Sequence, residues 1–135
     1  MNTTAPTRPA ALHRHCVLLT AGPAAAGEAR GRVRAAICTW DVRVDADVAV
    51  LLTSELVTNA IREETGETVT LTIACSRDEL RVDVHDTSCS QPVPGRAAVD
   101  EEAGRGLVLV DSLSDEWGWY QTPSGKAVYF RLGFG

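Results

Sequence analysis

The sequence lacks the signatures of several common protein classes. Its four cysteines, at positions 16, 38, 75 and 89, form no Cys-x-x-Cys pair, so neither a zinc site nor a redox-active dithiol is expected. Cys38 and Cys75 fall in apolar patterns and are interpreted as buried thiols. No apolar run is long enough to span a bilayer, and no basic region precedes an apolar segment at the N-terminus. These absences favour a reducing cytoplasm and predict no membrane contact.

Basic residues are fewer than acidic residues in this sequence. The chain carries a formal net charge of −5 and a pI of about 5.1, so direct nucleic-acid binding is not expected. Hydrophobic residues make up 44% and charged residues 23% of the sequence, which is typical of globular proteins. The length of 135 residues suits one domain, and we expect a flexible tail at residues 1–12 followed by a single domain at 13–135.

Hydrophobic periodicity predicts two helices followed by hairpins. Helical spacing is found over residues 24–40 and, most strongly, over residues 47–61, with Gly66 as a stop signal. Alternating apolar residues predict strands near residues 15–20, 69–75, 80–86, 117–120 and 127–132. The first helix carries Arg30, Arg32 and Arg34 on its polar side, where they form either a solvated face or a docking patch.

The helix predicted over residues 47–61 contains two polar residues inside an apolar pattern. Glu55 and Asn59 are four residues apart, so they share one face of the helix, one turn apart. One interpretation is that they line the solvent side and contact each other. The other is that they point into a ligand cavity, where the amide oxygen of Asn59 holds a metal ion and the carboxylate of Glu55 accepts a proton.

The strand predicted over residues 80–86 ends in a carboxylate on its inward-facing side. Asp86 has the parity of the apolar residues of that strand, so it is either a strand-end cap or a buried hydrogen-bond acceptor for a ligand. Residues 87–103 show little periodicity and end at Gly104-Arg105-Gly106-Leu107, before an apolar helical run. Glycines at a helix start let phosphate approach backbone N–H groups, although a plain loop-to-helix turn has the same pattern.

In this order the motifs resemble the GHKL-type ATP-binding fold (Bergerat fold) shared by gyrase, histidine kinases and mismatch-repair ATPases. The resemblance is closer to bacterial anti-sigma-factor serine/threonine-protein kinases and their actinobacterial relatives. It covers residues 18–132, and its matches are residues 54–60, residues 82–88, Gly104–Leu107, Trp117-Gly118 and Gly125-Lys126. It implies an α+β fold, a two-layer α/β sandwich with a mostly antiparallel mixed sheet.

The resemblance also implies roles for single residues. Asn59 would hold Mg²⁺, and Glu55 would act as general base on a substrate serine. Asp86 would accept a hydrogen bond from the adenine amino group, with Ser88 in the same cofactor-binding motif at a position where glycine is frequent. Residues from 88 to 103 would form a lid over the ATP. Backbone donors to the phosphates would come from Gly104, Arg105, Gly106 and Leu107.

Two departures from the family pattern bear on ATP affinity. Glu63 stands where these relatives often carry histidine, and its negative charge would weaken nucleotide binding. Ala127 stands where a threonine often supports the adenine-binding aspartate, and the lost hydroxyl contact is worth on the order of 1 kcal/mol. The loss of that contact would lower ATP affinity without abolishing it.

The function implied by the resemblance is an Mg-ATP-dependent serine/threonine-protein kinase. It would regulate a sigma factor by partner switching, phosphorylating an antagonist protein of the STAS type. A homodimer is a further expectation, since relatives often dimerise. The alternative is a non-catalytic module, ATP-binding or nucleotide-free, that sequesters a protein partner. A plain α+β domain without ligand would leave the inward Asp86 and the ordered motifs as coincidences.

Overall fold

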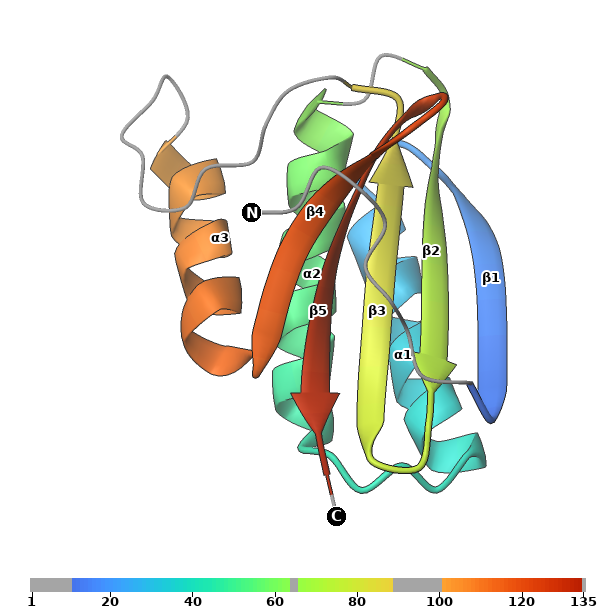
Figure 1. The fold of residues 1–135 in the computed structure, drawn as a ribbon. Coiled ribbons are helices and arrows are strands. Elements are labelled where there is room, and N and C mark those ends of the chain that lie inside the picture. The colour runs from blue at the N-terminus through green and yellow to red at the C-terminus, as the bar shows by residue number, and fades with distance from the viewer. Residues whose placement is uncertain (1–10, 64–65, 89–100, 135) are drawn as a thin grey trace.

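The computed structural model describes residues 11–63, 66–88 and 101–134, without the side chains of residues 101–105. In this part of the chain, three helices lie against one face of a five-stranded sheet (Figure 1). The elements follow the order β1 (His13–Thr20), α1 (Ala25–Thr39), α2 (Ala46–Glu63), β2 (Thr68–Cys75), β3 (Glu79–Asp86), α3 (Glu101–Leu113), β4 (Glu116–Thr122) and β5 (Gly125–Gly133).

The sheet has the strand order β1-β2-β3-β5-β4. Strands β3 and β5 are neighbours although α3 and β4 lie between them in sequence, so the end of β3 meets the start of β5. The expected two-layer α+β fold is confirmed. Among the described strands every pairing is antiparallel, so no parallel pair contributes to this part of the sheet.

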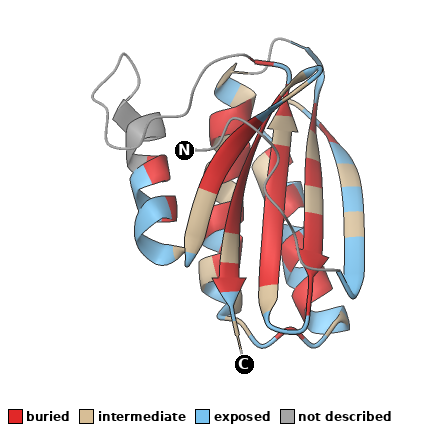
Figure 2. Ribbon diagram, viewed as in Figure 1, coloured by how far each residue is buried: buried red, intermediate tan, exposed pale blue. Residues whose placement is uncertain are grey.

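The core lies between the sheet and the helices. Alternate residues of the central strands, such as Ile73, Val82 and Phe130, are fully buried and face the apolar side of α2, where Leu52 and Leu56 are 0% and 1% exposed (Figure 2). Full burial of each such side chain contributes roughly 1.5–3 kcal/mol, which holds α2 in a fixed position against β3 and β5. The predicted central helix is therefore confirmed, and the core fixes which of its faces is turned inward.

Two of the three arginines on α1 form hydrogen bonds with α2. Arg30 Nη1 donates to Ser54 Oγ at 3.1 Å, and Arg34 Nη2 donates to Asp47 Oδ1 at 3.2 Å. Arg32 pairs with Glu28 on its own helix, with 3.5 Å between the charged groups. These contacts are exposed and agree with the solvated-face interpretation of the three residues.

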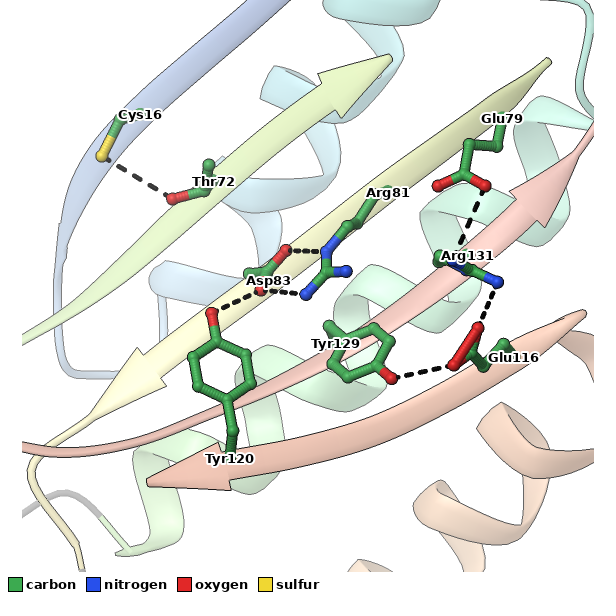
Figure 3. Close-up of polar contacts among 9 residues, drawn as sticks. All are labelled: Cys16, Thr72, Glu79, Arg81, Asp83, Glu116, Tyr120, Tyr129 and Arg131. Carbon is green, nitrogen blue, oxygen red and sulfur yellow. Dashed lines mark hydrogen bonds and ion pairs between the residues drawn. The ribbon is translucent and has the colours of Figure 1, made fainter. Parts of the chain in front are cut away.

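The opposite face of the sheet carries a polar cluster instead of a helix layer (Figure 3). Arg81 on β3 makes a two-pronged ion pair with Asp83, with distances of 2.8 and 3.1 Å, and Tyr120 donates to the same carboxylate at 2.9 Å. The guanidinium of Arg81 also lies 4.0 Å from the ring centroid of Tyr129. Mutual pairing and the aromatic surface allow these charged residues to be buried at 4% and 6% exposure.

One of the two cysteines that were expected to be buried lies on the surface. Cys75 is buried as expected, but Cys38 is exposed, because it follows the buried Ile37 on α1 and is turned away from the core.

Among the helices that the structure describes, none combines the length and the apolar character that crossing a membrane requires.

Candidate functional site

The site begins on α2, where the two polar residues singled out in the sequence have different surroundings. Asn59 is 5% exposed, so it does not line the solvent side of the helix. Glu55 is half-buried one turn earlier. The solvent-facing interpretation is therefore wrong for Asn59. Its burial at this point agrees with a ligand-facing position, and its role as a metal ligand stays a prediction.

The carboxylate of Glu55 lies against the backbone of α3. A Cβ atom added at Gly106 would come within 2.6 Å of Glu55 Oε2, closer than real Cβ contacts. The absence of a side chain at Gly106 thus leaves the space that the carboxylate of Glu55 occupies between α2 and α3. The structure therefore brings together two predicted site residues that are far apart in sequence.

Asp86, at the end of β3, is 1% exposed. Its Oδ1 accepts the backbone N–H of Ser88 at 2.8 Å, which is the strand-end cap that one interpretation required. Its Oδ2 is buried and has no hydrogen-bond partner within the described structure, and such an orphan acceptor costs free energy unless a ligand satisfies it. The two oxygens thus separate the two expected roles, with Oδ1 as the cap and Oδ2 available to a donor.

A lysine that the sequence interpretation left without a role completes this end of the site. Lys126 is 1% exposed, and its Nζ lies 3.3 Å from Asp86 Oδ1 and is also bonded to Glu63 Oε2. In the β3–β5 register Lys126 pairs directly with Asp86, so both side chains face the helix layer. The parity of Lys126 with the buried Val128 and Phe130 was the available sequence signal.

The positions of Lys126 and Ala127 correct the assignment of the supporting residue. Ala127 pairs with His85 and packs with Tyr120 and Tyr129 on the far face of the sheet, so it does not face Asp86. A hydroxyl at position 127 would not reach that carboxylate, and its absence removes no contact there. Glu63 is likewise no isolated extra charge, because Lys126 pairs with it.

A glycine makes this close approach of β5 to β3 feasible. A Cβ at Gly125 would overlap the carbonyl oxygen of Asp86 and lie 2.6 Å from the Cα of Thr87. Both obstacles are backbone atoms, which cannot rotate away as a side chain can. Gly125 therefore allows β5 to begin directly against the end of β3. The next residue, Lys126, can then contact Asp86.

Burial sets the electrostatics of Asp86. Removal from water raises the pKa of Asp86 above its ordinary value of 3.8, because the charged form is the one that loses hydration. The positive charge of Lys126 and the hydrogen bonds from Ser88 and Lys126 act in the opposite direction, and the negative charge of Glu63 adds a smaller upward contribution. The net direction is upward.

The predicted phosphate-binding turn differs most from the expectation. Helix α3 begins at Glu101, so Gly104-Arg105-Gly106-Leu107 lies inside the helix and not before it. Amides beyond the first turn have carbonyl acceptors within a helix, so Gly106 and Leu107 have no free N–H groups here. Leu107 is instead a core residue at 3% exposure. Of the lid expected over residues 88–103, residues 89–100 lie outside the described residues, as does the side chain of Arg105, and residues 101–103 belong to α3.

The described donor set suits a metal ion that brings most of its own ligands. No group of three or more His, Cys, Asp or Glu side chains among the described residues is arranged to hold a metal ion. Mg²⁺ in nucleotide sites takes one or two protein oxygens and completes its shell with phosphates and water. A single buried amide oxygen at Asn59 fits that pattern, since the remaining ligands would arrive with the nucleotide.

Comparison with known sequences places this architecture in a family. The sequence model described as "Histidine kinase-like ATPase domain" matches residues 19–132, which is most of the chain. The chain belongs to the histidine kinase-like ATPase family. The uncharacterized protein SCO4941 of Streptomyces coelicolor is 39% identical over 80 residues, a stretch that covers 56% of this chain and 75% of that protein.

Membership of the histidine kinase-like ATPase family identifies an ATP-binding domain of the GHKL type, a family that typically uses Mg²⁺ and supports kinase-type chemistry. Two observations fit such a ligand. The free Oδ2 of Asp86 is a buried acceptor for an amino group, and Asn59 offers a buried amide.

Proposed function

We propose that this histidine kinase-like ATPase is a cytoplasmic Mg-ATP-dependent serine/threonine-protein kinase that regulates a sigma factor by phosphorylating a STAS-type antagonist. The observation that carries the proposal is the placement of Glu55. Its carboxylate is held against Gly106 of α3, one turn of α2 away from the buried Asn59. A proton acceptor beside a candidate metal ligand is the minimum that phosphoryl transfer to a hydroxyl requires.

Each residue has a separate task in this proposal. Mg-ATP supplies the phosphoryl group and the charge neutralisation that its transfer needs. Asp86 Oδ2 would accept a hydrogen bond from the adenine amino group, and Asn59 would hold the metal ion through its amide oxygen. Glu55 would accept the proton of the substrate hydroxyl as that oxygen bonds to the γ-phosphorus and the bond from this phosphorus to the β-phosphate oxygen breaks, releasing ADP. Catalysis is then mainly positioning of the two reactants, since the protein forms no covalent bond itself.

Phosphoryl transfer to candidate antagonists tests the proposal. The chain is incubated with radiolabelled ATP, Mg²⁺ and a set of STAS-type domains, and labelled serine or threonine is quantified. Glu55→Gln removes the base and is expected to lower the rate about a hundredfold or more, with ATP affinity retained. Glu28→Gln is the matched control, because it makes the same change on the exposed surface of α1. Equal rates for wild type and Glu55→Gln, or no transfer to any candidate, would count against the kinase.

A non-catalytic module that sequesters a protein partner is the second candidate. The continuous course of α3 through Gly106 and Leu107 favours it, because the amides expected to meet the phosphates are already paired inside the helix. Isothermal titration with Mg-ATP separates the nucleotide-free form of this module from a protein with a working nucleotide site. Heat that saturates, and that is lost in Asn59→Ala, supports the nucleotide site, whereas no heat at millimolar ATP supports the nucleotide-free module.

The partners in this proposal are a sigma factor, its antagonist and a second copy of the chain. Size-exclusion chromatography with light scattering measures the mass of the free chain and of its mixtures with each candidate. A mass of twice 14.4 kDa supports the homodimer, and a monomer at all concentrations contradicts it.

A further inference from the structure

Lys126 has no role in the mechanism derived above, although it is among the largest fully buried side chains of the described residues. We propose that Lys126, anchored by Glu63, is the positioning residue of the base subsite, holding Asp86 ionised and oriented so that a base with an amino group is selected over one with a carbonyl. The inference rests on the proposed nucleotide site and deepens it by naming what sets its base preference.

The geometry places Lys126 where it controls Asp86 directly. The two residues are cross-strand partners in β3 and β5, and both side chains are withdrawn from water at 1% and 0% exposure. Nζ is 3.3 Å from Asp86 Oδ1 and also contacts Glu63, which is 27% exposed at the end of α2. A buried lysine with two carboxylate partners is held in one position, because any other position would leave a charge unpaired.

The contacts divide the Asp86 carboxylate into two functionally different oxygens. Oδ1 accepts both the backbone N–H of Ser88 and Lys126 Nζ, so its orientation is fixed from two directions. Oδ2 has no hydrogen-bond partner in the part of the structure that is described. An ionised carboxylate accepts hydrogen bonds only, whereas a protonated one can donate. The charge on Asp86 therefore decides whether Oδ2 favours an amino group or a carbonyl oxygen.

The surrounding charges make that state depend on Lys126. Among the described residues, the charged groups that act on Asp86 are Lys126 from β5 and Glu63 from α2. Burial raises the pKa of Asp86, Lys126 lowers it, and Glu63 raises it. Without Lys126, the carboxylates of Asp86 and Glu63 would lack the cation that now lies between them, which favours protonation of the more buried Asp86.

Nucleotide preference measured against pH tests the inference. Dissociation constants of the wild type and of Lys126→Met are determined for ATP and for inosine triphosphate, whose base has a carbonyl in place of the amino group. The titrations run from acid to mildly alkaline pH, because the pKa of Asp86 is raised above its ordinary value and its charge is lost as the pH falls. Wild type is expected to prefer ATP at neutral and alkaline pH and to lose part of that preference only at the acid end, where Asp86 takes up a proton. In Lys126→Met the preference is expected to fall about tenfold or more, and to fall further as the pH is lowered.

The outcomes separate positioning from a merely structural role. If Lys126 has only a structural role, Lys126→Met would weaken the binding of both nucleotides equally at every pH. That result would overturn the inference, and so would an unchanged preference for ATP. The double variant Lys126→Met/Glu63→Gln is expected to regain part of the preference, because it also removes the nearby negative charge. Asp47→Asn is the surface control, with a side chain that is 89% exposed.

Near-ultraviolet circular dichroism shows whether Lys126→Met folds. If it does not, Glu63→Gln provides a second test of the inference. This variant leaves Lys126 in place and removes a charge that raises the pKa of Asp86. The acid limb of ATP binding is therefore expected to move to lower pH, and an unmoved limb overturns the inference. A wild type that binds neither nucleotide is a different result, because it rejects the proposed nucleotide site itself.

Discussion

Single residues of the site differ in how far their surroundings constrain them. Asp86 is fully enclosed and has one unsatisfied oxygen, Asn59 is buried on α2, and Glu55 is half-buried against α3. A buried acceptor without a donor is unfavourable in the free protein and becomes favourable when a ligand supplies the donor. The unsatisfied Oδ2 of Asp86 therefore destabilises the free protein and favours the binding of a ligand that donates a hydrogen bond to it.

Gly106→Ala tests the placement of Glu55. The added Cβ would meet the end of a flexible side chain and not backbone, so the carboxylate shifts while the fold is retained. Alanine also has the higher helix propensity, by about 1 kcal/mol, so thermal stability is expected to be equal or higher. We expect phosphoryl transfer to fall about tenfold or more with ATP affinity unchanged, because the general base is displaced. A transfer rate equal to that of wild type would show that the position of Glu55 is not critical.

Asp86→Asn tests the electrostatic cost of the buried carboxylate. Because the pKa of Asp86 is raised in the folded state, the folded protein binds this proton more tightly than the unfolded chain does. Its contribution to stability therefore falls as pH rises from about 4 through the raised pKa. Urea unfolding at several pH values should show the variant gaining relative to wild type over that window, while ATP affinity is lost. A stability difference that does not change with pH would contradict the assignment.

At the scale of elements, the site depends on how β5 and α3 meet their neighbours. The crossover that places β5 beside β3 brings Lys126 to Asp86, and the packing of α3 on α2 brings Gly106 to Glu55. On the far face, the guanidinium of Arg81 on β3, which is paired with Asp83 of the same strand, also lies over the ring of Tyr129 on β5. The strand pair at the centre of the sheet is therefore held from both faces, which keeps the end of β3 in one position.

Gly125→Ala tests the contact between the start of β5 and the end of β3. The new Cβ would overlap backbone atoms of Asp86 and Thr87, so one strand has to move. We expect a loss of about 2–4 kcal/mol in the free energy of unfolding, with weaker ATP binding. The matched control is Gly31→Ala on α1, where nothing lies within 4 Å of the added atom. That change should stabilise the protein by about 0.5–1 kcal/mol, and equal effects of the two would contradict the argument.

At the scale of the whole molecule, nucleotide binding and folding are linked. A ligand that binds only the folded state stabilises it by about 2.7 kcal/mol at a hundred times its dissociation constant. For a chain of 135 residues this corresponds to a rise in Tm of roughly 5–10 °C. Differential scanning fluorimetry with Mg-ATP is expected to show this rise in wild type and not in Asn59→Ala. A rise of the same size in both proteins would show that Asn59 does not contribute to binding.

The sequence was sufficient for much of the fold and for part of the site. The helix through Asn59 and the strand ending at Asp86 follow from periods of about four and of two, which are local properties of the chain. The same parity argument placed Asp86 inward, as the structure confirms. The family resemblance instead implied a supporting role for position 127, but Ala127 faces the other side of the sheet and Lys126 pairs with Asp86.

The amino-acid order by itself determined which residues share a face of a helix or strand, because side-chain direction repeats within each element. Only the tertiary structure decided which faces meet: Lys126 with Glu63 and Asp86, and Glu55 with the bare backbone of Gly106. It also decided where α3 begins. These contacts join segments that are distant in sequence, and their free energy comes from burial and charge pairing across the packed layers, which no local pattern encodes.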